Sequence, residues 1–217
     1  VGCSMLGTFL FLTYFFQATL HYSALRTGFA FLPFSGGIIF GAGVSSRYLP
    51  RVGPRALMVT GLAIAAGGLL WFTRLGVTSS YAGHVLPPEI LVSIGMGLTF
   101  VAMSSTALIG VDQKDAGVAS ALVNTTQQIG GALGTAFLNT VAAAAATSYL
   151  AAHVKSATET QIASVHGYTT AFEVSAVLVT LAALTAALFI RASRDDVQPE
   201  AIEFVDRDEL EPALAMK

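Results

Sequence analysis

The sequence predicts an all-α integral membrane protein with six transmembrane helices. Three observations lead to this fold class. Of the 217 residues, 54% are hydrophobic and only 11% are charged, whereas a soluble domain carries about 25% charge. The charges leave long apolar runs between them, with the roughly 20 residues that a membrane helix needs. These runs are too long and too uniformly apolar for the strands of a membrane barrel, so we expect helices.

The first half of the chain supplies three of the expected helices. Uncharged runs cover residues 1–25, 27–46 and 56–73. Each run is long enough for one crossing of the hydrocarbon core. We therefore expect spans over residues 1–19, 28–46 and 56–73.

The second half supplies the other three, because a run that crosses lipid must satisfy its backbone within one helix. We expect spans over residues 88–111, 117–142 and 170–190. The connection 142–168 is rich in alanine, which favours a helix that protrudes from the membrane. Residues 1–192 thus form one predicted bundle, and the acidic residues 193–217 are expected to be a disordered tail.

The distribution of arginine and lysine predicts the orientation, because cytoplasmic connections carry the excess of basic residues. Six basic residues lie at one set of helix ends and three at the other. The larger set is Arg47, Arg51, Arg55, Lys114, Arg191 and Arg194, and the smaller set is Arg26, Arg74 and Lys155. We expect the larger set, and with it the acidic tail, in the cytoplasm.

Composition and motifs exclude several classes of function. The formal net charge is −2, so no basic surface for nucleic acid is expected. A single cysteine and four dispersed histidines offer no metal site. Phosphate-binding loops, nucleophile elbows and zinc-protease motifs do not occur. We therefore expect no enzyme activity and no cofactor.

One face of the fourth span predicts a binding cavity. At 100° per residue a single stripe is formed by Glu89, Ser93, Met96, Phe100 and Ser104. An acid, hydroxyls, a thioether and an aromatic ring suit a broad-specificity site for amphiphilic cations. An alternative for Glu89 is a purely local role at the helix N-terminus, which favours acidic residues.

Small residues mark expected helix contacts. Gly37 and Gly41 form a GxxxG pair, as do Gly130 and Gly134, and such pairs let membrane helices approach closely. In the fifth span one polar and small face contains Ser120, Asn124, Gln127, Gly131, Gly134 and Thr135. This face either packs on a neighbouring helix or lines the transport path, and its glycines favour packing.

The connection between the second and third spans carries three arginines, and its two prolines are expected to interrupt helicity. Its notable residues are Arg47, Pro50, Arg51, Gly53, Pro54 and Arg55. The arginines anchor the loop in the cytoplasm. The alternative is a conformational latch, in which they bind carboxylates or helix C-termini in one state only.

Two segments resemble drug:proton antiporters with 14 spans, and a third resembles the cytoplasmic loop signature of the major facilitator superfamily as a whole. Residues 14–33 (YFFQATLHYSALRTGFAFLP) are similar to the signature YxxQxxxGxSxxxxGxxxLP. Residues 115–136 (DAGVASALVNTTQQIGGALGTA) resemble AGxASxxxNxxxQxGGAxGxA, and residues 51–55 resemble an RxGxR loop. The first signature adds Tyr14 and Gln17 as substrate-cavity candidates. His21, Ser46 and Pro50 depart from the family pattern.

The resemblance implies the last six spans of such a transporter, its C-terminal bundle. It implies proton-coupled efflux of drugs or other amphiphiles by alternating access in the plasma (inner) membrane. The expected partners are the lipid bilayer, the N-terminal bundle of the same transporter, a small amphiphilic substrate and protons. Two alternatives stay open, an exporter of an endogenous metabolite and a non-transporting membrane scaffold.

Overall fold

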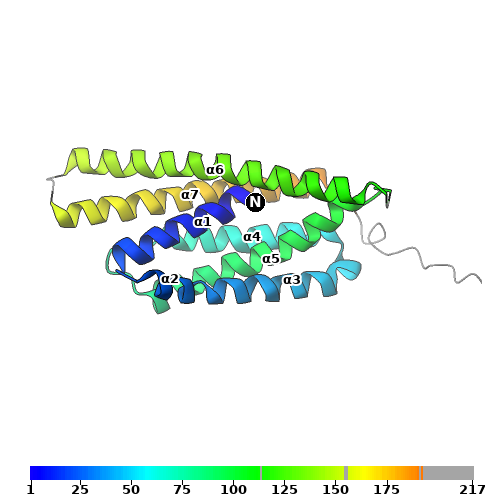
Figure 1. The fold of residues 1–217 in the computed structure, drawn as a ribbon, viewed down its shortest axis with the longest axis horizontal. Coiled ribbons are helices and arrows are strands. Elements are labelled where there is room, and N and C mark those ends of the chain that lie inside the picture. Colours follow the sequence, from blue (N-terminus) through cyan, green and yellow to red (C-terminus); the bar gives the residue numbers. More distant parts are fainter. Residues whose placement is uncertain (113, 154–155, 191, 193–217) are drawn as a thin grey trace, which may run out of the picture.

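The computed structural model describes residues 1–112, 114–153, 156–190 and 192, and within these the chain is a bundle of helices without strands (Figure 1). The elements are α1 (Gly2–Tyr14), the π-helical turn η1 (Phe15–Thr19), α2 (Ala24–Ala30), α3 (Leu32–Val52), α4 (Pro54–Phe72), the π-helical turn η2 (Tyr81–Val85), α5 (Leu86–Leu108), α6 (Ala116–Ala152) and α7 (Ala157–Phe189). The all-α prediction is confirmed. The predicted acidic tail, residues 193–217, lies outside the described residues.

Five helical segments of the described chain are long and apolar enough to cross a membrane. They are Ala24–Val52, Pro54–Phe72, Tyr81–Leu108, Ala116–Ala152 and Ala157–Phe189. These segments confirm the integral membrane fold class. The first expected span is helical through α1 and η1 but is not among the five, so the count of six spans stays a prediction.

The second span differs from its predicted outline. It starts earlier, at Ala24, where the Ser23 side chain accepts a hydrogen bond from the backbone N–H of Arg26 at 3.3 Å. It is broken at Phe31, so that α3 has a helix N-terminus of its own. The expectation that Pro50 interrupts helicity was wrong, because α3 continues through Pro50 to Val52. Gly53 ends it with φ 82°, a value that favours glycine, and Pro54 then starts α4.

Helices α6 and α7 are longer than their predicted spans. They form an antiparallel hairpin that extends beyond the ends of the other helices (Figure 1). The alanine-rich residues 142–152 continue α6, as their high helix propensity favours. Ser156 caps α7, since its side chain accepts a hydrogen bond from the N–H of Glu159 at 3.1 Å.

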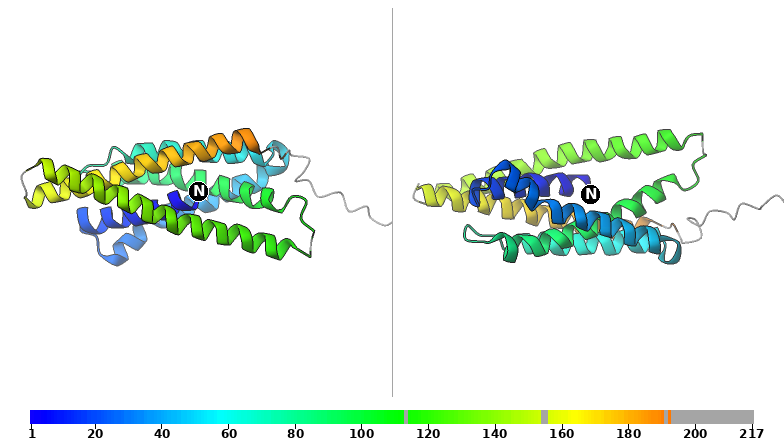
Figure 2. Two further views of the ribbon diagram at one scale, coloured as in Figure 1. Left: turned by 90° about the horizontal axis from the view of Figure 1, so that it is seen from above. Right: turned by 60° about the horizontal axis from the view of Figure 1, so that its bottom comes forward.

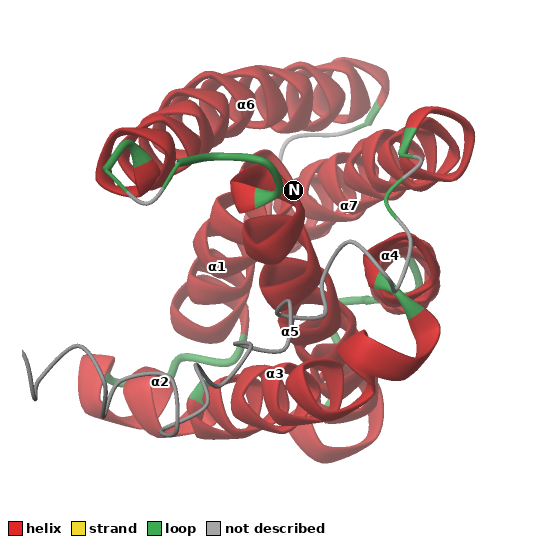
Figure 3. Ribbon diagram, turned by 90° about the vertical axis from the view of Figure 1, so that its right-hand side faces the viewer, coloured by secondary structure: helices red, strands yellow, loops and turns green. Residues whose placement is uncertain are grey.

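The bundle is organised around α5, which lies between α3 and α4 in the view along the helices (Figure 3). Glycines make the contacts of α5 with α4 and with α3 close. A Cβ atom at Gly61 of α4 would lie 2.7 Å from the carbonyl oxygen of Gly95, and one at Gly68 would lie 2.9 Å from that of Pro88. On the other side, Gly41 of α3 meets the backbone of α5 at Ile94 and Gly97. Helices without side chains at the contact approach until their backbones touch.

A second group consists of α1, α6 and α7. Gly131 of α6 faces Leu6 of α1, where a Cβ atom would lie 2.6 Å from the leucine Cδ1. The rings of Phe72 in α4 and Phe172 in α7 stack with centroids 4.9 Å apart and join the two groups. Helix α6 therefore lies at the edge of the bundle, where its N-terminal half diverges from α5 (Figure 2).

The glycine contacts predict a position-specific effect on stability. Gly41→Ala places a methyl group against the backbone of α5, and the helices must separate to accept it. We expect the free energy of unfolding to fall by about 1–3 kcal/mol. The measurement is the thermal unfolding midpoint of the purified protein in detergent.

Gly43→Ala is the matched control, because it lies two residues away on the same helix and a Cβ atom there has no neighbour within 4 Å. We expect it to leave the midpoint unchanged or slightly raised, since alanine favours helix. Equal midpoints for the two variants would contradict the assignment of Gly41 to a close helix contact.

Candidate functional site

A stripe of polar and small residues runs along α6 at intervals of four residues. It consists of Gln127, Gly131, Thr135 and Asn139. Each step of four residues turns the helix by about 400°, so these side chains lie one above the other with a slow drift. The stripe passes from a pocket between α5 and α6 to a groove between α1 and α6.

The α5–α6 pocket has a volume of about 180 Å³. It is lined by Phe100, Ser104, Leu108, Ser120, Val123, Asn124 and Gln127. Five of these residues come from the two faces that the sequence singled out, one on the fourth span and one on the fifth. Phe100 is 49% exposed, so its ring is accessible to a ligand rather than covered by its own bundle.

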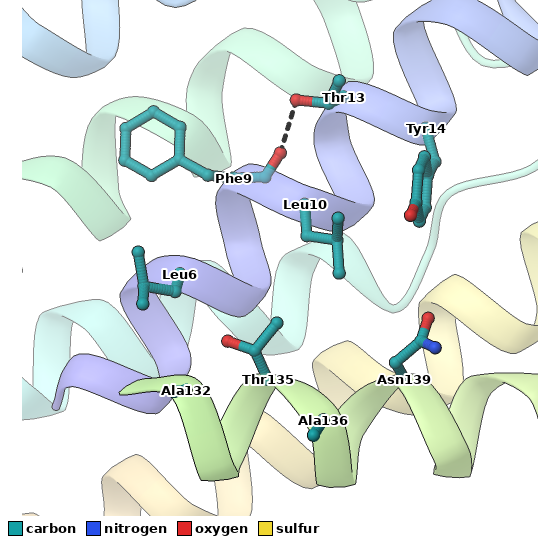
Figure 4. A pocket seen from close by; sticks show the side chains of 9 residues that line it. All are labelled: Leu6, Phe9, Leu10, Thr13, Tyr14, Ala132, Thr135, Ala136 and Asn139. Atoms are coloured by element: carbon teal, nitrogen blue, oxygen red, sulfur yellow. Dashed lines mark hydrogen bonds between the residues drawn. The ribbon is translucent and has the colours of Figure 1, made fainter. Parts of the chain in front are cut away.

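The α1–α6 groove is larger, with a volume of about 620 Å³. Figure 4 shows its lining side chains, which are Leu6, Phe9, Leu10, Thr13, Tyr14, Ala132, Thr135, Ala136 and Asn139. Thr13 donates a hydrogen bond to the carbonyl oxygen of Phe9 at 2.6 Å, whereas the hydroxyl of Thr135 is buried without a partner.

Among the polar residues of the groove, Thr13 and Asn139 were not singled out from the sequence. Asn139 continues the spacing of four residues from Gly131 and Thr135, so the pattern itself carried a signal. Thr13 carried no such signal in the sequence. Its hydroxyl donates a hydrogen bond within its own helix, as threonines of membrane helices commonly do. Tyr14, which the family signature suggested, lines the groove and is 42% exposed. Gln17 is exposed in η1 and lines neither hollow.

The structure divides the predicted stripe of α5 into two parts. Phe100 and Ser104 reach the α5–α6 pocket, whereas Glu89, Ser93 and Met96 are buried inside the bundle. The cause is the crossing of α3 over the first half of α5. Ser93 lies against Gly37, and its hydroxyl donates to the carbonyl oxygen of Ile90 at 2.9 Å.

Gly131 and Gly134 of α6 lie against α1 of the same bundle, whereas Gly130, which was expected to form a contact pair with Gly134, has no neighbour within 4 Å. The small face of the fifth span was expected to pack on a neighbouring helix or to line the transport path, and in the structure Gly131 contacts Leu6 and Gly134 contacts Cys3. The polar residues and the glycines of this face thus have different neighbours. Ser120, Asn124 and Gln127 line the α5–α6 pocket, and the glycines set the distance to α1.

The arginines of the α3–α4 connection differ in their surroundings. Arg47 and Arg51 are exposed at the end of α3. Arg55, at the start of α4, donates a hydrogen bond to the carbonyl oxygen of Ala187 near the end of α7. Such a carbonyl belongs to the negative end of a helix dipole, which attracts a cation. The contact joins the N-terminus of α4 to the C-terminus of α7.

The two hollows can bind an amphiphile but contain no reactive group. Their linings combine aromatic rings, aliphatic side chains, hydroxyls and amides, without an acid, a histidine or a lysine. Within the described residues no cluster of three or more His, Cys, Asp or Glu side chains could hold a metal ion. Aromatic faces attract organic cations, and a few polar groups orient a ligand in a mostly apolar site.

Comparison with known proteins finds relatives that are named for antibiotic resistance or export. The chain is 45% identical over 181 residues to a puromycin resistance protein of Streptomyces alboniger, covering 81% of this chain and 36% of that protein. It is 40% identical over 141 residues to a cephamycin export protein of Amycolatopsis lactamdurans, covering 64% and 29%. A lincomycin resistance protein of Listeria monocytogenes is 28% identical over 193 residues, covering 88% and 40%.

The chain thus spans about a third of the length of these relatives. The profile of the Major Facilitator Superfamily matches residues 1–135, from α1 into the glycine-containing face of α6. This match and the resistance and export proteins confirm the family that the signature segments predicted. The chain belongs to the Major Facilitator Superfamily.

Proposed function

We propose that this chain is the C-terminal six-helix bundle of a proton-coupled exporter of drugs or other amphiphilic small molecules. The observation that carries the proposal is the α5–α6 pocket, in which Phe100, Ser104, Asn124 and Gln127 from two helices converge without an acid or base. Such a lining binds an amphiphile and performs no covalent chemistry. The chain acts as a transporter and not as an enzyme.

The exposure of α6 favours the presence of a partner bundle that would cover it. Only Gly131, Leu138 and Ala142 of this 37-residue helix are buried. Asn124 is exposed in its N-terminal half, and a polar side chain at membrane depth must face protein or water rather than lipid. An N-terminal bundle that packs across α5 and α6 would meet this need and would close the pocket into a central cavity.

Alternating access follows from this arrangement. The two bundles rock against each other around a site near the membrane midplane. Here α3, α4 and α5 would move as one body because their backbones are in contact. The stripe on α6 would offer polar groups along the route from the α5–α6 pocket to the α1–α6 groove.

A second candidate is an exporter of an endogenous metabolite. It is favoured by the 40% identity to a protein that is named for cephamycin export. The same pocket and the same mechanism serve both candidates, and they differ only in the ligand. A non-transporting scaffold has no such support.

The first test is efflux from cells that express the transporter. We expect uncoupler-sensitive export of ethidium or puromycin, and Asn124→Leu should reduce it strongly by removing an amide from the pocket. Thr125→Leu is the matched control, since this neighbouring residue is exposed and does not line the pocket. Membrane abundance is measured by immunoblot. If both variants export at the same rate at equal abundance, the pocket is not the binding site.

The second test concerns orientation in the plasma (inner) membrane. The α3–α4 and α5–α6 connections and the end of α7 lie at one end of the bundle (Figure 1), and we assign this end to the cytoplasm because Arg47, Arg51, Arg55 and Lys114 lie there. In a Cys3→Ser background, Thr78→Cys should react with an impermeant thiol reagent outside intact cells. Val52→Cys should react only after permeabilisation. Both sites are exposed, and the reverse labelling pattern would overturn the assignment.

A further inference from the structure

Glu89 is a buried carboxyl in the first turn of α5 that neither hollow uses. Its side chain is 0% exposed, and both carboxyl oxygens lack a hydrogen-bond partner. No salt bridge reaches it among the described residues. A structural acid at a helix N-terminus normally remains in contact with water or with backbone N–H groups. This carboxyl is shielded from water and accepts no hydrogen bond, although the backbone N–H of Phe34 lies beside it.

The carboxyl lies at the break between α2 and α3. The hydroxyl of Tyr81 in η2 and the backbone N–H of Phe34 in α3 are beside it. The Tyr81 hydroxyl is itself directed to α2, where it donates to the carbonyl oxygen of Ala30 at 2.9 Å. Three chain segments therefore meet around Glu89, and each of them ends or bends at this point.

No cation faces this carboxyl from the elements around it. The described parts of α3 and α4 beside it, Leu32 to Gly43 and Leu62 to Phe72, contain no titratable residue. In η2, Tyr81 faces it, and His84 is exposed and near Ser80 instead. Arg26 is exposed and lies over the ring of Tyr22, 3.9 Å from its centroid. An ionised carboxylate here would have neither water nor a counter-ion.

An isolated ionised carboxylate in an apolar environment is so unfavourable that the group takes up a proton instead. Intramembrane acids of this kind are rare and mark proton or substrate pathways. Building on the proposed function, we propose that Glu89 is a proton-binding site of the exporter, protonated while α2 and η2 close over it and deprotonated when they move away from α3 and α5.

The chemistry of the step is a simple acid–base equilibrium. When water enters, the O–H bond of the carboxylic acid breaks, the proton passes to water and the carboxylate remains hydrated. On closure the carboxylate takes a proton back from hydronium, which leaves water, and loses its charge before it is buried. The break at Phe31 gives α2 and α3 a place to hinge, so the charge on Glu89 and the packing of the outer helix ends depend on each other.

The test uses the full-length transporter, with Glu89→Gln as the neutral isostere and Glu173→Gln as the control. Glu173 is an exposed acid on α7 and belongs to neither hollow. Infrared spectra of purified protein at neutral pH should contain the carbonyl band of a protonated carboxylic acid. We expect this band to be lost in Glu89→Gln and retained in Glu173→Gln. A band that persists in Glu89→Gln, or its absence from the unmodified protein, overturns the proposal.

A second arm in proteoliposomes tests coupling, with ethidium as the probe. In Glu89→Gln we expect loss of transport driven by a pH gradient, while transport down an ethidium gradient continues, because the fixed neutral side chain still permits closure. If Glu89→Gln transports ethidium under a pH gradient as fast as Glu173→Gln does, Glu89 has no coupling role. If the unmodified protein moves no ethidium under either gradient, the proposed export of this dye fails, and the infrared arm alone decides the protonation of Glu89.

Discussion

The contact of helix backbones at glycine is the constraint on which the rest of this bundle depends. In lipid no hydrophobic effect drives helices together, so close packing has to supply the attraction. Gly41, Gly61 and Gly95 remove the side chains at the two crossings of α5, and α3 and α4 meet its backbone from either side. A hydrogen bond from the Ser45 hydroxyl to the Leu98 carbonyl at 2.9 Å adds a polar link inside the α3–α5 contact.

The close packing of α3 and α4 on α5 determines which polar residues of α5 remain accessible. Where α3 crosses α5 closely, Glu89 and Ser93 are enclosed, and the acid is left without a partner. Where α5 runs free of α3 and diverges from α6, Phe100 and Ser104 become accessible and form a pocket with the polar face of α6. One helix thus carries both the proposed proton-binding residue and the proposed amphiphile pocket, and packing separates the two.

Much of this could be predicted from the sequence, and the failures have physical causes. Apolar run length predicted the membrane helices, and helical periodicity singled out the faces of the fourth and fifth spans from which Phe100 and Asn124 line one pocket. Periodicity places residues on a face but does not say which neighbour covers it, so the burial of Glu89 and the packing of Gly131 on α1 were not foreseen. Pro50 was expected to interrupt the helix, but α3 continues to Val52 with the loss of one backbone hydrogen bond, to the carbonyl of Ser46, and ends only at Gly53.

The central claim is that the α5–α6 pocket holds the exported molecule. The most direct measurement is photocross-linking of an azide derivative of puromycin to the full-length transporter in membranes, followed by mass spectrometry of the modified peptides. The account predicts modification within Phe100 to Leu108 of α5 or Ser120 to Gln127 of α6, and competition by excess puromycin. Competed modification found solely on other segments, with both of these peptides recovered unmodified, would contradict it.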